Sequence, residues 1–333
     1  MKNFVEVLRG GKLESRHTIH AAVVDSSDNL RASLGNPDLP TYFRSSAKPF
    51  QTLALFRTGV ADHFDLSDRE LAIITASHNG EDFHIGLVRQ ILRKIGANEA
   101  DLRCGFHPPM YGPAAQKFFA ENRMPSPIYN NCSGKHAGML AACKAHNYDL
   151  KTYLEPDHPH QRAIRKVIAE FSGVPEGDIH TGVDGCGVPV FYLTLRQMAR
   201  MYARFAASTE PAVRRVREAM MRYPEWVAGT GRFDTAFMRL LQGRAFSKTG
   251  AEGVQSVAFL DPGPIALVAK AEDGQRRGVE PAVVEIMLQL KWISAEEAEA
   301  LRRFWKPDIL NHAGRKVGGV RPKIELNFPG SSS

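Results

Sequence analysis

The sequence contains few cysteines and lacks a long apolar run. Four cysteines in 333 residues are too few for a disulfide scaffold and predict a reducing compartment. No apolar stretch approaches the roughly 20 residues that span a bilayer. The first ten residues contain Glu6 and Arg9 in place of the apolar core of a signal peptide. We therefore expect a cytoplasmic, soluble protein that does not bind membranes.

Dense runs of one charge are also absent. The 43 basic residues exceed the 36 acidic ones, for a net charge of +7, but the basic stretches around Arg215 and Arg276 stop at two or three charges. Acidic residues such as Glu210 and Glu272 lie nearby in the sequence. This distribution indicates a solvated surface and predicts no nucleic-acid partner.

The chain shows no internal repeat and no Pro-, Gly- or Ser-rich linker. With 43% hydrophobic and 24% charged residues, its composition is that of an ordinary globular protein. We expect a single domain over residues 1–328, with an internal helical lobe at about 40–245, and a flexible tail at 329–333.

Periodicity predicts strands near both ends of the sequence and helices between them. Strand patterns occur at residues 17–24, 71–75 and 265–269, and a turn at 25–29 predicts a hairpin. Helical patterns occur at residues 46–58, 81–95, 114–123, 134–146, 160–171, 193–206, 211–222, 233–242, 278–290 and 294–304. This order predicts an α+β fold, with an antiparallel sheet built from both termini and a helical region beside it.

Ser45 and Lys48 form the first chemical signal. Three residues apart, they would be neighbours on one helix face, and Pro49 must lie in the first helical turn because proline has no N–H. This Ser-x-x-Lys pattern suits a serine nucleophile with a lysine base, provided that the lysine pKa falls by about three units. Alone, the pattern also fits a capping serine beside a surface lysine.

Two further motifs strengthen the catalytic interpretation. Ser77, His78 and Asn79 follow the expected strand at 71–75, and Lys248 begins a Lys-Thr-Gly sequence. Ser-x-x-Lys, Ser-x-Asn and Lys-Thr-Gly in this order are the motifs of serine β-lactamases and penicillin-binding proteins. They predict a serine hydrolase that forms an acyl-enzyme.

A second cluster combines cysteine and lysine. Cys132 and Lys135 lie where a loop enters an expected helix, and Cys186 lies in a glycine-flanked loop next to Asp184. The spacing leaves three interpretations open: a zinc site, a pair of buried unpaired cysteines, or a nucleophilic cysteine at a helix start. His84 is expected to be structural. The glycine-rich segment Gly229 to Arg232 fits a turn on the substrate side or a simple loop.

Together, these motifs resemble those of the rhizobial-type (class 3) L-asparaginases. The Asn-Cys-Ser-Gly-Lys-His block that contains Cys132 and the Asp-Gly-Cys sequence that ends at Cys186 are the most specific parts of the likeness. The resemblance covers nearly the whole chain. It implies a fold like that of serine β-lactamases and glutaminases, and a homodimer.

The resemblance also implies roles for individual residues. It implies two Ser–Lys pairs, Ser45 with Lys48 and Ser77 with Lys248, and one Zn²⁺ per chain. The implied zinc ligands are Cys132, Lys135 and Cys186, with Asp184 close to the fourth position. Candidate substrate-binding residues are Arg44, His78, Glu81, Asn131 and Asp184.

The resulting expectation is hydrolysis of L-asparagine to L-aspartate and ammonia through a serine acyl-enzyme. Ser46 is a second hydroxyl beside Ser45, so the choice of nucleophile depends on the spacing to Lys48. A glutaminase or a β-lactam-reactive hydrolase would share this chemistry. A zinc-stabilised binding domain is the alternative that is not an enzyme.

Overall fold

A computed structural model describes residues 2–330 of the chain, so residues 331–333 of the expected flexible tail lie outside the described part. The chain divides into two compact units. The first comprises Met1–Ser46, Leu193–Ala207 and Ala236–Ser333, and the second Ala47–Tyr192 and Ser208–Thr235. The single domain with a helical lobe at about 40–245 stays a prediction.

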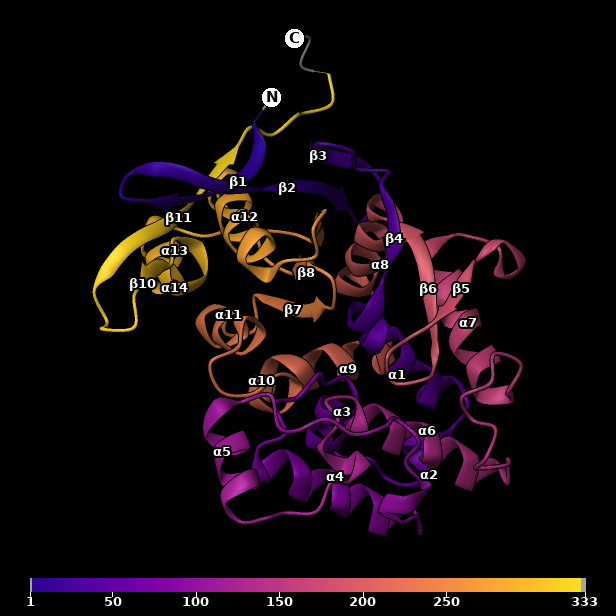
Figure 1. Cartoon of the computed structure of the whole chain (residues 1–333). Helices are drawn as coiled ribbons and strands as arrows, with labels where there is room; N and C mark the ends of the chain where they lie inside the picture. The colour runs from indigo at the N-terminus through magenta and orange to yellow at the C-terminus, as the bar shows by residue number, and fades with distance from the viewer. Residues whose placement is uncertain (1, 331–333) are drawn as a thin grey trace. The chain divides into compact units, whose positions relative to one another are not determined.

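An antiparallel sheet forms the centre of the first unit (Figure 1). Its strands pair in the order β10-β11-β1-β2-β9-β8-β7, and β3 pairs with the second half of β2. The strands of this unit are β1 (Asn3–Arg9), β2 (Lys12–Asp25), β3 (Leu30–Leu34), β4 (Pro40–Tyr42), β7 (Ala245–Gly250), β8 (Val254–Phe259), β9 (Ile265–Ala271), β10 (Asp308–Leu310) and β11 (Lys316–Ile324). Strands from both ends of the chain therefore share one sheet, as predicted.

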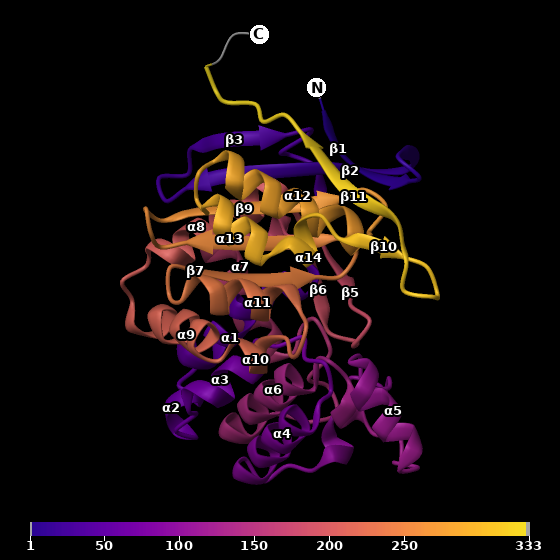
Figure 2. The same ribbon diagram turned by 90° about the vertical axis from the view of Figure 1, so that its left-hand side faces the viewer.

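Helices cover both faces of this sheet. On one face lie α12 (Arg276–Gln289), α13 (Ala295–Ala300) and α14 (Arg302–Trp305), and Figure 2 looks onto that side. On the other lies α8 (Leu195–Ala207), which packs on β2 and β9. Every residue of β7 and β8 is buried, and this includes polar residues such as Lys248 and Gln255.

The second unit is built mainly of helices. They are α1 (Lys48–Arg57), α2 (Val60–His63), α3 (Asp68–Ile74), α4 (Asp82–Lys94), α5 (Gly112–Ala120), α6 (Ser133–His146), α7 (Pro159–Ser172), α9 (Pro211–Arg222) and α10 (Pro224–Val227). α11 (Phe233–Leu241) runs from this unit into the first. The remaining strands, β5 (Thr181–Val183) and β6 (Pro189–Thr194), pair as an antiparallel hairpin. No helix in the described part of the chain is long and apolar enough to cross a membrane.

The predicted α+β class and most predicted helices are confirmed, but the strand expected at 71–75 is wrong. These residues belong to the helix α3 and to the residue that follows it. Ser67 and Glu70 form a reciprocal capping box at its start, with the Glu70 carboxylate 2.7 Å from the Ser67 nitrogen. A short apolar run fits either a buried strand or a buried helix. Here the capping box favours the helix, because it satisfies backbone N–H groups at the helix start. The single helix expected at 294–304 is split into α13 and α14.

Candidate active site

Lys48 is the first residue of α1 and is only 1% exposed. Pro49 lies in the first turn, as its missing N–H requires. The Lys48 Nζ donates to Ser77 Oγ at 3.0 Å and to the Ala76 carbonyl, and it lies 3.2 Å from Cys132 Sγ. Burial lowers the pKa of Lys48, although the neighbouring Cys132 opposes this effect. A buried amine therefore contacts a serine hydroxyl.

The segment Ser77 to Asn79 lies between two other segments of the second unit. The Ser77 N–H donates to the Val227 carbonyl at 3.0 Å, and the His78 N–H donates to the Asn131 carbonyl at 3.1 Å. The segment follows the helix α3, not a strand, but its polar side chains are buried. These two bonds hold the backbone that carries the Ser77 hydroxyl.

Both ring nitrogens of His78 bind within the protein. Its Nδ1 accepts the Gly80 N–H at 3.1 Å, so Nε2 carries the proton and donates to Ser133 Oγ at 2.9 Å. Burial lowers the pKa of His78 well below its ordinary value. In this structure, neutral His78 joins the site segment to the start of α6.

The start of α6 brings Cys132 and Lys135 to the site. The Cys132 N–H donates to Asn130 Oδ1 at 2.9 Å, which shapes the loop before the helix. A Cβ atom on Gly134 would lie 2.2 Å from the Ile73 carbonyl oxygen. Only glycine therefore allows α6 to approach the end of α3 this closely.

Cys186 reaches the same place from the turn between β5 and β6. The Asp184 N–H donates to the Val188 carbonyl at 2.9 Å, and Gly187 has a left-handed φ of +88° that closes the turn. Lys135 Nζ lies 3.0 Å from Cys186 Sγ, and Asp184 Oδ2 lies 3.8 Å from the same sulfur. The structure thus brings the three predicted zinc ligands together.

Two of the three side chains in this cluster hold their protons more tightly than usual, so a bound metal would have to displace those protons. A hydrogen bond to Cys186, together with burial, raises the pKa of Cys132 to about 12, and the same hydrogen bond lowers the pKa of Cys186 well below its ordinary value. Burial lowers the pKa of Lys135, but the sulfur charges outweigh burial and the net shift is upward. These directions favour a charged Cys186 sulfur beside a protonated Lys135 amine.

Two thiols and an amine are soft and borderline donors of the kind that zinc accepts once they lose their protons. Within residues 2–330, no three His, Cys, Asp or Glu side chains converge as a metal site. A metal at this cluster would therefore need the Lys135 amine as its third protein ligand.

Glu81, a candidate substrate-binding residue, contacts protein groups through both carboxylate oxygens. Its Oε1 accepts from the Thr230 N–H at 2.8 Å and from Asn79 Nδ2 at 3.2 Å, and its Oε2 accepts from the Thr230 hydroxyl at 2.7 Å. Glu81 therefore holds the loop that contains Thr230.

In the first unit, the serines and Lys248 occupy neighbouring segments. Ser46 Oγ donates to the Lys248 carbonyl at 2.8 Å and is fully buried, whereas Ser45 is half-buried. Both serines lie in a 3-10 turn, Arg44–Ala47, and Arg44 has a left-handed φ of +52°. Because the Ser46 hydroxyl is used by the strand β7, these contacts favour Ser45 as the serine available for chemistry.

A sequence comparison decides the family. The model of the family described as L-asparaginase II matches residues 5–322. The chain belongs to the L-asparaginase II family. As a member, it is an amidohydrolase of the asparaginase type. No curated protein matches the chain significantly.

Two solved structures are similar to this L-asparaginase II family member at low identity. One is a β-lactamase from Mycobacterium bovis, with 13% identity, a TM-score of 0.39, and coverage of 77% of this chain and 88% of the other. The second, from Bacteroides dorei, is provisionally called a β-lactamase. It has 12% identity, a TM-score of 0.38, and coverage of 80% of this chain and 84% of the other. Both TM-scores are below 0.5, so we draw no conclusion from these likenesses.

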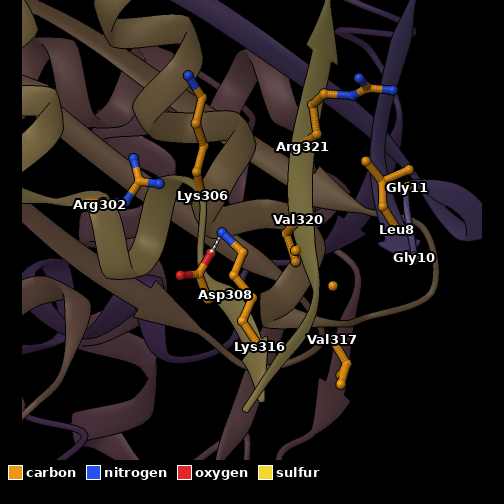
Figure 3. A pocket seen from close by; sticks show the side chains of 12 residues that line it. Leu8, Gly10, Gly11, Arg302, Lys306, Asp308, Lys316, Val317, Val320 and Arg321 are labelled. Atoms are coloured by element: carbon orange, nitrogen blue, oxygen red, sulfur yellow. Dashed lines mark ion pairs between the residues drawn. The ribbon is translucent and has the colours of Figure 1, made fainter. Parts of the chain in front are cut away.

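A groove of about 580 Å³ lies elsewhere in the first unit, between β11, α14 and the β1–β2 turn (Figure 3). Its charged lining residues include Arg302, Lys306, Lys316 and Arg321, and Lys316 pairs with Asp308 at 2.7 Å. None of the twelve described residues that line it is a serine, cysteine or histidine. The groove therefore contains none of the candidate catalytic residues.

The sequence anticipated the thiol–amine cluster but missed one contact. Its spacing paired Lys48 with Ser45, whereas the contact observed in the second unit joins Lys48 to Ser77. Ser45 and Lys248 belong to the first unit, whereas Lys48 and Ser77 belong to the second. The pairs Ser45–Lys48 and Ser77–Lys248 therefore stay predictions. No sequence signal indicated that the end of α3 would reach Lys48.

Proposed function

We propose that the protein is an L-asparaginase that uses serine and lysine residues. The main support for this proposal is the position of the Lys48 amine. This amine is almost fully buried and lies 3.0 Å from the Ser77 hydroxyl oxygen. Such a pair is suited to moving a proton between a hydroxyl and an amine. Membership of the L-asparaginase II family supports an amide substrate.

In the proposed reaction, Ser45 attacks the carbon of the side-chain amide of L-asparagine and gives its proton to Lys48. The C–N bond then breaks, and the leaving nitrogen takes a proton through Ser77 and departs as ammonia. Water then hydrolyses the β-aspartyl ester to release L-aspartate and restore the serine. The roles of Ser45 and Lys248, the proposed partner of Ser77, rest on the sequence motifs and the family.

The α-groups of the substrate need a cation and an anion beside the reacting amide. Arg44, Asn131 and Asp184 are proposed binders, and Asp184 carries the negative charge that an α-ammonium requires. The two other candidates, His78 and Glu81, bind protein groups in the structure. For these two residues we therefore favour an indirect effect on the substrate.

We also propose that Cys132, Lys135 and Cys186 hold one zinc ion. The fit rests on the short Lys135–Cys186 contact and on the chemistry of the donors. Bound zinc would supply positive charge to orient the substrate. By the same family resemblance, we propose a cytoplasmic homodimer.

Ammonia release from L-asparagine tests the proposed activity. We expect the Ser45→Ala enzyme to lose at least about 1,000-fold in kcat, because it lacks the nucleophile. Lys48→Met should lose about 100- to 10,000-fold, because the proton acceptor is gone. Ser26→Ala, at an exposed serine, is the matched control and should behave as wild type.

L-Glutamine and a penicillin should be tested as alternative substrates of the wild-type enzyme. Faster ammonia release from glutamine would indicate a glutaminase, and acylation by the penicillin would indicate a β-lactam-reactive enzyme. If the Ser45→Ala enzyme released ammonia from asparagine as fast as wild type, Ser45 would be excluded as the nucleophile.

A further inference from the structure

A small cavity lies between helices of the second unit, beside the cluster of Cys132, Lys135 and Cys186. The helices α1, α6 and α7 pack on one another there, and α6 also packs on α3. The lining of the cavity includes Gln51 of α1, Lys135 of α6 and His160 of α7. Its volume is about 10 Å³. One water molecule needs about 10–15 Å³, so the cavity has room for a single water.

Two of the side chains that line the cavity carry polar atoms that the protein does not satisfy. Within residues 2–330, neither Gln51 Oε1 nor His160 Nδ1 has a hydrogen-bond partner, and both atoms are buried. The two residues are only 6% and 2% exposed. A buried polar atom without a partner costs free energy, and ordered water commonly satisfies such atoms. Both atoms therefore indicate a bound water.

The chemistry of the lining favours water over an ion. Gln51 Oε1 can only accept a hydrogen bond, so an anion, which has no donor, cannot satisfy it. A cation would be repelled by the Lys135 amine in its protonated form. Burial lowers the pKa of His160 to about 3, so its ring is neutral and one ring nitrogen accepts. Water both donates and accepts, and it carries no charge.

The Lys135 amine needs such a partner if it binds the proposed zinc ion. An amine that gives its lone pair to a metal keeps two N–H donors. Lys135 Nζ lies 3.0 Å from Cys186 Sγ, but that sulfur is itself a proposed ligand. The N–H donors therefore require acceptors outside the ligand set. Groups that bind a metal ligand in this way fix its orientation.

On the basis of the proposed zinc site, we infer that the cavity binds one water molecule, which connects Lys135 to Gln51 and His160. The water donates its two hydrogens to Gln51 Oε1 and His160 Nδ1 and accepts an N–H of the Lys135 amine. Three hydrogen bonds are typical of a buried water. Gln51 and His160 are positioning residues, because they act on the metal through the water and Lys135.

A crystal structure of the zinc-loaded wild type at about 1.5 Å resolution tests the water directly. We expect electron density for one water within about 3.2 Å of Gln51 Oε1, His160 Nδ1 and Lys135 Nζ. A map without density for a water among these three atoms would overturn the inference.

Competition with a chromophoric zinc chelator tests the effect on the metal. Gln51→Met removes the amide and keeps the length of the side chain, and His160→Leu removes both ring nitrogens. Each variant should weaken zinc affinity about 10- to 100-fold. His160→Asn keeps a polar atom near the position of Nδ1 and should recover part of the loss. Zinc affinity within about twofold of wild type in both Gln51→Met and His160→Leu would overturn the inference.

Gln161→Met is the matched control for Gln51→Met. Gln161 is also a buried glutamine, and its Nε2 donates to the Tyr153 carbonyl at 2.8 Å. It is not among the described residues that line the cavity. Because Gln161→Met loses a hydrogen bond within the protein, it should lower the Tm of the metal-free protein at least as much as Gln51→Met does. Its zinc affinity should nevertheless stay within about twofold of wild type. Equal losses of zinc affinity in both variants would show a general effect of core substitutions and would refute the outer-shell role.

The same measurements separate this inference from the proposed zinc site. If wild type contains no zinc by elemental analysis but the map shows the water bonded to Lys135 Nζ, the zinc proposal fails and the water site stands. If wild type binds zinc and the map shows no water in the cavity, the zinc proposal stands and this inference fails.

Discussion

The close approach of α6 to α3 at Gly134 leads to a strong prediction for Gly134→Ala. The added Cβ would lie 2.2 Å from the Ile73 carbonyl oxygen, while real Cβ contacts stay beyond 3.0 Å. The two helices must therefore separate by at least about 0.8 Å, since a backbone carbonyl cannot rotate away as a side chain can. Overpacking of this kind costs about 1–3 kcal/mol of unfolding free energy.

The position of the helix makes the same substitution damaging to activity. Gly134 lies between Cys132 and Lys135, so a shift of α6 moves both away from Ser77 and Lys48. A displacement near 1 Å of groups that must align costs about 100-fold in rate. We therefore expect ammonia release from asparagine to fall by about that factor.

Gly86→Ala is the matched control for Gly134→Ala. Gly86 lies inside α4 with nothing within 4 Å of an added Cβ, so alanine should stabilise the helix by about 0.5–1 kcal/mol. Urea unfolding followed by circular dichroism compares the two variants. If Gly134→Ala were as stable as Gly86→Ala and fully active, the close helix contact would not constrain the site.

Two further predictions concern the metal and acid stability. We expect purified wild type to carry about one zinc ion per chain by elemental analysis; Cys186→Ser should lose it, and Cys104→Ser, outside the cluster, should keep it. Zinc retained by Cys186→Ser would contradict the ligand assignment. Burial lowers the pKa of His84 to about 4, so below its ordinary value near 6.5 only the unfolded chain takes up the proton, and stability falls as the pH falls. From pH 7 to pH 5 this costs about 2 kcal/mol. Urea unfolding should therefore find a loss of stability that is about 2 kcal/mol larger in wild type than in His84→Gln, and an equal loss in both proteins would show that His84 is not responsible.

Local sequence signals predicted much of the fold. The long helices have clear apolar periods, and the hairpin of β2 and β3 has a turn of Asp, Ser and Asn residues. The short run at 71–75 gave an ambiguous pattern, and the cap formed by Ser67 and Glu70 decided in favour of a helix. Several strands, β1 and β11 among them, were not predicted, because their half-exposed residues lack a strict alternation.

The sequence by itself determined the chemistry that is available. Ser45, Lys48, Cys132, Lys135 and Cys186 stand out because each lies in a motif whose residue types and spacing suit nucleophilic or metal chemistry. Family membership follows from the same motifs and is confirmed over residues 5–322.

Only the tertiary structure decided which of these groups meet. Lys48 contacts Ser77 and Cys132 through segments 29 and 84 residues away, and no local pattern encodes such distances. The structure likewise showed the Glu81 carboxylate bound to Thr230, 149 residues later in the chain. Long-range contacts depend on how helices pack, and packing is set by the whole core rather than by neighbouring residues.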